Sequence, residues 1–329
     1  MSDLSTPYLG FVLSNPLVVA ASPITRDLDL VRRAEDAGAS AFVMHSLFEE
    51  QIEFESLDLN ENLELGAESN AESASYFPDM RTYNTGPEGY LDQLRKIKKA
   101  VKVPVFGSLN GTSVGGWVEY ARLMEEAGAD GIELNVYDIP TDPRMSSEQI
   151  ERNLIHLVKA VVSQIRVPLA VKLSSFFTAP VNLLQQLHEA GVGAAVLFNR
   201  FYQPDFDIDN LDVVPHLRFS HSEELLVRLH WCGVIYGRVP MELAVTGGAH
   251  TARDVVKCMM AGANVVMLAS ALMRHGPAHI SHLLTDIRHW MAEHEYTSIR
   301  QMQGAMSFKK VANPQAYERG NYMRVLRRS

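Results

Sequence analysis

Short apolar runs alternate with longer amphipathic stretches along most of the chain. The apolar runs have the length of β-strands, several are rich in β-branched residues, and they cover residues 17–21, 41–46, 105–110, 131–136, 169–174, 194–199, 243–247 and 265–270. Segments with apolar residues at helical spacing lie between them, at 29–37, 117–127, 150–165, 181–190 and 252–261. This alternation of strand and helix predicts an α/β protein with a parallel sheet.

Four of the predicted helices end in closely related turns. Each turn carries a glycine just before the next strand, namely Gly38, Gly128, Gly191 and Gly262. A glycine at this position is typical of a helix C-cap. Eight such strand-helix units favour a closed (β/α)8 TIM barrel. The alternative, an open flavodoxin-like or dinucleotide-binding sheet, needs a glycine-rich first turn, whereas the first strand runs into Ala20-Ala21-Ser22-Pro23.

Two connections are too long for plain loops, so we expect insertions after strands 2 and 6. The first is strongly acidic, because residues 34–80 contain no Lys or Arg. The second, at 200–239, predicts a hairpin followed by a helix at 222–233, acting either as a lid over the site or as a structural element at the rim. A basic tail begins at about residue 305; it docks on a neighbour's acidic insertion or is independently solvated. We assign one domain, 1–329.

Composition narrows the class of protein. A net charge of -9 over 329 residues argues against a broad nucleic-acid footprint. No apolar run is long enough to span a membrane and residues 1–9 lack signal-peptide features, so we expect a cytoplasmic protein. The two cysteines, Cys232 and Cys258, are too few for a four-thiolate cluster and are expected to be packed thiols. Any electron acceptor must then be a separate soluble molecule or redox partner.

Polar residues and glycines stand at the predicted carboxyl ends of the strands. They are Ser22, His45, Asn110, Asn135, Lys172, Asn199, Gly247, Gly248 and Ser270. In a barrel these ends line one mouth. The Gly247-Gly248 turn lets backbone N–H groups approach a phosphate, and Ala269-Ser270 adds further donors after the eighth strand. The pattern predicts a site for a polar, anionic ligand. The histidines at 275, 279, 282 and 289 suggest a solvated helix face and no metal site.

Lys172 needs a partner, because a buried ammonium without one loses several kcal/mol of solvation. A flavin supplies one, since its reduced ring carries negative charge near N1 and O2. The alternatives are a structural ion pair with a barrel acid and a Schiff-base lysine. Asn135 and Asn199 fit hydrogen bonds to flavin or substrate carbonyls, or are satisfied structural amides.

An ordered set of short motifs identifies a resemblance. The motifs are Asn15-Pro16, Ala20-Ala21-Ser22, Glu133-Leu134-Asn135, Val171-Lys172-Leu173, Asn199, Thr246-Gly247-Gly248 and Ser270-Ala271-Leu272. Over about residues 9–304 the chain resembles class 1 dihydroorotate dehydrogenases, in which an FMN-bearing barrel oxidises dihydroorotate to orotate for pyrimidine synthesis. The resemblance also implies a homodimer.

The resemblance assigns roles to individual residues. Contacts to FMN would come from Ala21, Ser22, Ser46, Asn135, Lys172, Gly248 and Ser270. Asn84 in Tyr83-Asn84-Thr85-Gly86, with Asn135 and Asn199, would hold the dihydropyrimidine-like substrate. By their positions at strand ends, His45, Asn110, Asn199, Gly247 and Ala269 join the predicted cofactor-binding set.

The chain departs from the family pattern where the chemistry is concentrated. Asp138 stands in the place of the family's catalytic cysteine or serine, Tyr137 replaces a usual serine, and Pro140 replaces a substrate-binding asparagine. Asp138 or Tyr137 acts as the base, or both are loop residues. His45 replaces the family's lysine after strand two; it interacts with the flavin, titrates near neutrality, or is a satisfied structural histidine.

Three functions follow from these patterns. The first is an FMN-dependent oxidoreductase of dihydroorotate dehydrogenase type, acting on a CH–CH bond with Asp138, Tyr137 and Lys172 as catalytic residues. The second is an FMN-binding protein that has lost dihydroorotate activity and acts in electron transfer or regulation; the altered residues around Asp138 favour it. The third is a Schiff-base aldolase built on Lys172.

Overall fold

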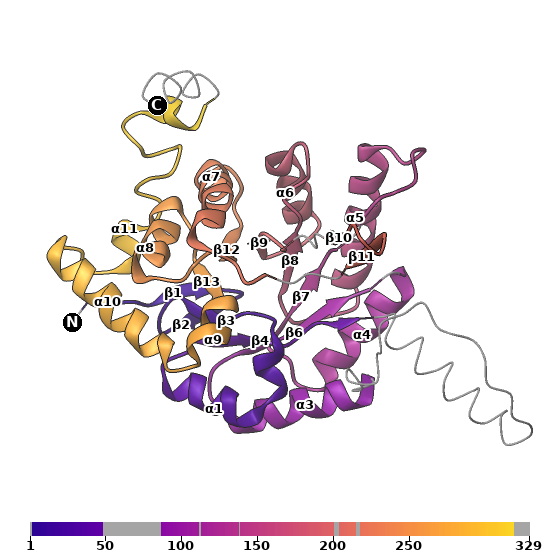
Figure 1. Cartoon of the computed structure of the whole chain (residues 1–329), viewed down its shortest axis with the longest axis horizontal. Helices are drawn as coiled ribbons and strands as arrows, with labels where there is room; N and C mark the ends of the chain where they lie inside the picture. Colours follow the sequence, from indigo (N-terminus) through magenta and orange to yellow (C-terminus); the bar gives the residue numbers. More distant parts are fainter. Residues whose placement is uncertain are drawn as a thin grey trace, which may run out of the picture.

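Parallel strands close into a barrel, as the sequence predicts (Figure 1). The computed structural model describes residues 2–48, 87–111, 113–137, 139–200, 204–214 and 218–318. The barrel strands are β3 (Leu17–Val19), β4 (Ala41–Val43), β6 (Val105–Asn110), β7 (Gly131–Asn135), β8 (Leu169–Leu173), β9 (Ala194–Leu197), β12 (Glu242–Thr246) and β13 (Val265–Leu268). Parallel pairing of β4 with β6, and of β13 with β3, completes the ring. The predicted (β/α)8 TIM barrel is confirmed.

Helices surround the barrel on its outside. They are α1 (Leu28–Asp36), α3 (Pro87–Ala100), α4 (Val114–Glu126), α5 (Ser147–Val162), α6 (Pro180–Glu189), α7 (Leu225–Ile235), α8 (Ala252–Ala261), α9 (Ser270–His275), α10 (His279–Glu293) and α11 (Ile299–Met302), with 3-10 turns η1 (Pro23–Arg26), η3 (Ser222–Glu224) and η4 (Pro314–Tyr317). The five predicted helices begin and end within three residues of these bounds. α5 starts before its apolar pattern does, because Ser146 and Gln149 form a capping box.

The apolar core forms two layers. One lies between the strands and the helices, and the other fills the barrel interior with Val18, Ala41, Val43, Phe106, Ala170, Ala194, Val196, Ala244, Val265 and Met267. A hairpin that the sequence did not predict, β1 (Thr6–Tyr8) and β2 (Phe11–Leu13), covers the amino-terminal end of the barrel. Tyr8 meets Phe106 edge to face at 5.8 Å. Polar side chains that point into the barrel are therefore directed toward its carboxyl-terminal mouth.

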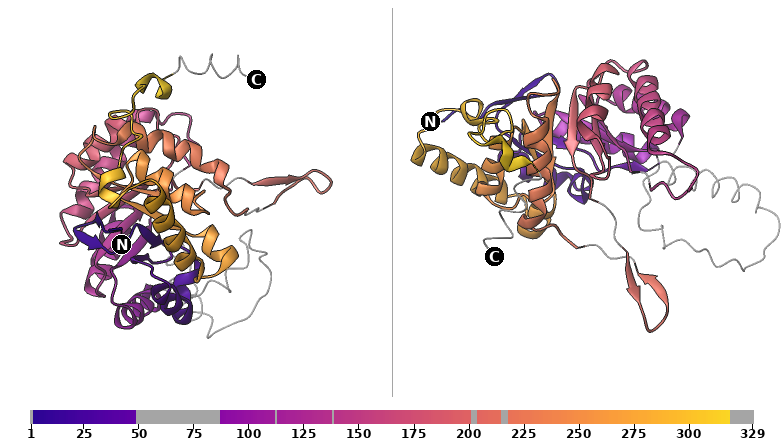
Figure 2. Two further views of the ribbon diagram at one scale, coloured as in Figure 1. Left: turned by 90° about the vertical axis from the view of Figure 1, so that its left-hand side faces the viewer. Right: turned by 90° about the horizontal axis from the view of Figure 1, so that it is seen from above.

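Both predicted insertions interrupt the barrel pattern. After β4, strand β5 (Leu47–Phe48) pairs with the end of β6. The acidic segment that follows, residues 49–86, lies outside the described residues, so its role stays a prediction. After β9, strands β10 (Asp205–Asp207) and β11 (Asp212–Val214) form the predicted hairpin. This hairpin projects away from the barrel (Figure 2), which fits the rim element better than the lid.

The carboxyl-terminal segment before residue 319 packs on α7. The Phe308 N–H donates to the Gly233 carbonyl at 2.9 Å, and the Arg238 guanidinium lies 4.0 Å from the centre of the Phe308 ring. Cys232 and Cys258 are fully buried, as predicted, and burial raises the pKa of both thiols. In the described ranges, none of the helices combines the length and the apolar character that crossing a membrane requires.

Candidate active site

Strand register brings polar residues, two of them predicted, to the mouth in two layers. Asn135 in β7 pairs with Lys172 in β8, and two residues earlier Glu133 pairs with Ser108 in β6. Side chains two residues apart on a strand share a face, so Asn135 and Glu133 both point into the barrel. The four side chains therefore lie close together, although three different strands supply them.

One chain of hydrogen bonds joins side chains from four strand ends. Asn199 Nδ2 donates to Asn135 Oδ1 at 2.5 Å, and Asn135 Nδ2 lies 3.3 Å from Ser46 Oγ. Ser46 Oγ in turn lies 2.9 Å from Ser108 Oγ. The structure thus brings Ser46, Asn135 and Asn199 together, as the sequence predicts. Because each amide is held by a neighbour, the polar face they present to the mouth is preorganised.

Lys172 forms an ion pair with Glu133, a residue to which sequence reasoning gave no role of its own. Lys172 Nζ lies 3.8 Å from Glu133 Oε1, and the two side chains are 11% and 3% exposed. Burial raises the pKa of Glu133, while the Lys172 charge and a hydrogen bond from Ser108 oppose that rise. The sequence feature that could have identified Glu133 is its position as an acidic residue in the middle of an apolar strand. The structural ion pair considered for Lys172 is therefore present, and the long contact leaves ammonium N–H groups for another ligand.

His45 is held inside the protein by the turn after β3. Its N–H donates to Thr25 Oγ1 at 2.7 Å, and its Nδ1 lies 3.3 Å from the same oxygen. The Tyr90 ring meets the imidazole edge to face at 5.1 Å. Burial and the nearby Arg26 charge lower the pKa of His45 to about 4. The structure therefore favours the satisfied structural histidine, and the titration near neutrality that we considered is not expected.

The lowered pKa of His45 should make the free energy of unfolding depend on pH. The pKa of His45 is 6.5 in its ordinary state and about 4 in the folded protein. The unfolded chain thus binds more protons between these values, and the stabilising contribution of neutral His45 is lost as the pH falls from 6.5 toward 4. We expect the wild type to lose about 2 kcal/mol more unfolding free energy than His45→Gln between about pH 7.5 and about pH 5. Urea unfolding at the two pH values measures this difference.

A matched control is available on the surface. His282 in α10 is exposed, so His282→Gln should keep the wild-type dependence on pH. An equal acid sensitivity of His45→Gln and wild type would contradict the neutral buried imidazole.

The double glycine after β12 forms a tight turn at the mouth. Gly247 and Gly248 have φ of 84° and 88°, and a Cβ on Gly248 would lie 2.7 Å from the backbone nitrogen of Leu225. The Gly248 N–H donates to Ser220 Oγ at 3.2 Å, and the Ser220 N–H donates to Ser270 Oγ at the same distance. The two predicted phosphate-binding segments, after β12 and β13, are therefore bridged by Ser220, which the sequence did not single out.

Arg228 of α7 is a third residue that sequence reasoning missed, after Glu133 and Ser220. Its Nε donates to the Thr246 carbonyl at 2.6 Å and its Nη1 to the Glu224 carbonyl at 2.7 Å. The side chain is buried, on the same helix face as Leu225 and Cys232. An arginine at apolar helical spacing was the signal that could have identified it.

The remaining predicted residues have varied positions. Ser22 is buried, and its Oγ has no hydrogen-bond partner among the described residues. Ala21 and Ala269 pack against the barrel interior, and Asn110 ends β6 beside Phe48. Tyr137 is half-buried just after β7. Asp138 and Asn84 lie outside the described residues, so their predicted roles as base and substrate ligand stay predictions.

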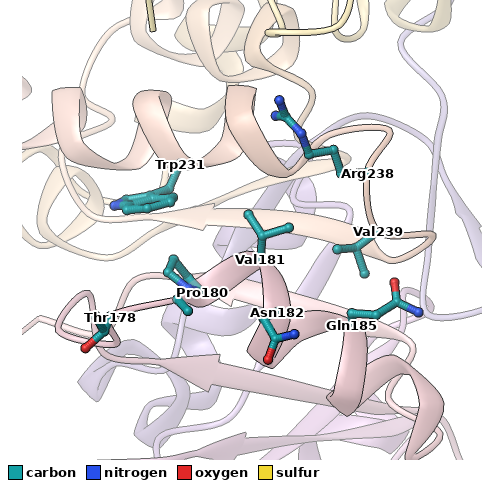
Figure 3. A pocket seen from close by; sticks show the side chains of 9 residues that line it. Thr178, Pro180, Val181, Asn182, Gln185, Trp231, Arg238 and Val239 are labelled. Atoms are coloured by element: carbon teal, nitrogen blue, oxygen red, sulfur yellow. The ribbon is translucent and has the colours of Figure 1, made fainter. Parts of the chain in front are cut away.

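A groove of about 550 Å³ lies outside the barrel, between α6 and α7 (Figure 3). Val181 of α6 and Trp231 of α7 line it from opposite sides, with Arg238 at one end. None of the predicted site residues lines this groove. The groove is therefore separate from the predicted site at the barrel mouth.

No family model matches the chain. The catalytic subunit of dihydroorotate dehydrogenase B (NAD(+)) from Thermoplasma acidophilum is 25% identical over 316 residues, covering 92% of this chain and 99% of the relative. Dihydroorotate dehydrogenase A (fumarate) from Lactococcus lactis subsp. lactis is 24% identical over 331 residues, covering 92% and 99%.

The chain is thus similar to dihydroorotate dehydrogenases over most of its length, at 24–25% identity. A further catalytic subunit, from Methanothermobacter thermautotrophicus, is 25% identical and is covered over 97% of its length. Each of the three similarities covers 92% of this chain. At this identity the similarity does not by itself assign a role to any residue of this chain.

Proposed function

We propose that this protein is an FMN-dependent oxidoreductase of dihydroorotate dehydrogenase type, which oxidises dihydroorotate to orotate or performs a related CH–CH oxidation. The observation that carries the proposal is that three groups of residues lie together at the carboxyl-terminal mouth of the barrel. The Lys172–Glu133 pair and the Ser46–Asn135–Asn199 chain occur at the same end of the barrel as the Gly247–Gly248 turn. A charged contact, amide hydrogen bonds and a phosphate turn are together the contacts that a flavin mononucleotide needs.

The described residues fit this cofactor at two points. The buried Ser22 hydroxyl lacks a partner at a strand end, so a ligand hydrogen bond there satisfies an otherwise costly group. The Gly247–Gly248 turn leaves no room for a Cβ on either glycine, so the backbone itself forms the cradle. When bound, the flavin supplies the acceptor for a hydride from a substrate carbon.

The chain's own residues then have distinct tasks. Lys172 stabilises negative charge that develops on reduction, because its ammonium is fixed in a buried site. Asn135 and Asn199 orient polar groups of cofactor and substrate through their amides. A proton leaves the substrate carbon next to the oxidised one, and Asp138 or Tyr137 is the proposed base. A homodimer and a separate soluble electron acceptor belong to the same proposal.

A second function has its own support. His45 replaces the family's lysine, and its lowered pKa of about 4 leaves it uncharged at neutral pH. With Asp138 and Pro140 replacing two other family residues, the substrate side of the site has changed more than the cofactor side. This favours an FMN-binding protein that has lost dihydroorotate oxidation and acts in electron transfer or regulation.

Anaerobic mixing with L-dihydroorotate separates the two functions. The purified protein is expected to carry a yellow, FMN-type absorbance, and rapid bleaching after mixing would support the dehydrogenase. A flavin spectrum that stays oxidised would contradict dihydroorotate oxidation and favour the second function. A protein that binds no flavin would overturn both. Asp138→Asn and Tyr137→Phe, compared over a range of pH, then identify the base.

A further inference from the structure

Arg228 lies directly beneath the double-glycine turn. A Cβ built on Gly247 would be 2.9 Å from Arg228 Nη2 and 3.1 Å from its Nε. The Nε–H donates to the carbonyl of Thr246, the residue just before the turn. The guanidinium is thus in contact with the backbone that forms the predicted phosphate cradle.

The charge of Arg228 is buried without a close carboxylate. The residue is 8% exposed, and over the described ranges no Asp or Glu oxygen lies within 4.0 Å of its guanidinium. Among acidic residues, Glu224 has the largest electrostatic effect on Arg228, but its carboxylate forms an ion pair with Arg200 at 3.7 Å. Burial accordingly lowers the pKa of Arg228. A buried cation of this kind is costly unless another anion balances it.

One side of the guanidinium also remains available. The two hydrogen bonds of Arg228 use Nε and Nη1, so Nη2 has no hydrogen-bond partner in the part of the chain that the structure describes. Of the atoms that a Cβ on Gly247 would meet, Nη2 is the nearest. An arginine presents its donors in a rigid fork, so fixing two of them also fixes the direction of the third.

We propose that Arg228 is the counter-charge of the phosphate site, holding the Gly247–Gly248 turn through Thr246 and selecting a flavin with a phosphate monoester over one without it. This inference rests on the proposed FMN site and adds a discriminating residue to it. Riboflavin, which lacks the phosphate, would bind through the ring contacts alone. FMN would also gain a charge-assisted interaction with a group whose charge is otherwise unbalanced.

The test compares the two flavins in variants of one residue. Arg228→Gln should raise the Kd of FMN at least about tenfold, since hydrogen bonds to charged groups contribute that much, and change the Kd of riboflavin less than about twofold. Arg228→Lys keeps the charge but not the fork, and an intermediate FMN/riboflavin ratio is expected. Fluorescence titration of flavin-stripped protein measures both constants. Inorganic phosphate should compete with FMN in wild type and not in Arg228→Gln.

Arg253→Gln is the matched control, because Arg253 is an exposed residue of the helix that follows the turn; it should keep the wild-type ratio. An FMN/riboflavin ratio in Arg228→Gln equal to that of wild type would overturn the inference; if both flavins also bind more weakly, it indicates a purely structural role. If Arg228→Gln does not fold, the ratio in Arg228→Lys decides in the same way. A wild type that binds neither flavin overturns the proposed function as well.

Discussion

Lys172→Met should slow flavin reduction by about 100-fold or more, because it removes the fixed charge that stabilises the reduced state. The same substitution should lower the flavin reduction potential. It also leaves Glu133 buried without its ion-pair partner, at a cost of about 3 kcal/mol in unfolding free energy near neutral pH. Anaerobic stopped-flow, a potentiometric titration and urea unfolding measure the three effects.

The pH dependence of that loss has a definite sign. The pKa of Glu133 is raised above its ordinary value of 4.5 mainly by burial. A carboxyl with a raised pKa costs nothing while it is protonated, so its effect on stability is absent below 4.5 and grows as the pH rises through the folded pKa. Lys172→Met should therefore destabilise the protein more at about pH 8 than at about pH 5.

A double variant separates charge from stability. Lys172→Met combined with Glu133→Gln removes both charges, so it should recover most of the lost stability while flavin reduction stays slow. Glu133→Gln alone removes the opposing charge beside Lys172 and should raise the flavin potential. Wild-type potentials in both single variants would contradict the assignment of Lys172 to the flavin.

Gly248→Ala is expected to cost about 3 kcal/mol of unfolding free energy and to weaken FMN binding about 100-fold. Gly248 has a φ of 88°, where an L side chain is strained, and the added Cβ would lie 2.7 Å from the backbone of Leu225. Because that neighbour is backbone, the turn itself must move, and its N–H groups move with it. Urea unfolding and FMN titration give the two values.

Gly128→Ala isolates the conformational part of this effect. Gly128 has a φ of 97°, but nothing lies within 4 Å of its Cβ position. It should cost about 1 kcal/mol and leave FMN affinity unchanged. Equal losses of stability and affinity in the two variants would contradict a tight cradle at Gly248.

Several elements were predictable for identifiable reasons. β6 has the predicted bounds of residues 105–110, because its apolar run ends sharply at both sides. β4 ends at Val43, although the predicted run reached Ser46, because His45 and Ser46 leave the ladder to bind Thr25 and Ser108. The β1–β2 hairpin was missed, because its strands of three residues carry too little pattern.

In the candidate site, too, some residues were predicted from the sequence and others were not. Asn135 and Asn199 were predicted because strand-end positions in a barrel converge on one mouth, and Ser46 was predicted from the family resemblance; the structure brings the three side chains together. Glu133 and Arg228, to which we give proposed roles, were not singled out from the sequence, since each occurs inside an apolar segment where periodicity predicts only core packing. Their importance comes from contacts with residues far away in the sequence.

The amino-acid sequence by itself determined the barrel, its two insertions and the end of the barrel that carries polar groups, because hydrophobic periodicity and the order of strands are local properties. Tertiary structure alone decided that Lys172 pairs with Glu133, that His45 is neutral and that Arg228 lies beneath Gly247. These features depend on burial and on distances of a few ångströms between separate strands and helices, and the electrostatic free energy of a group changes steeply with both.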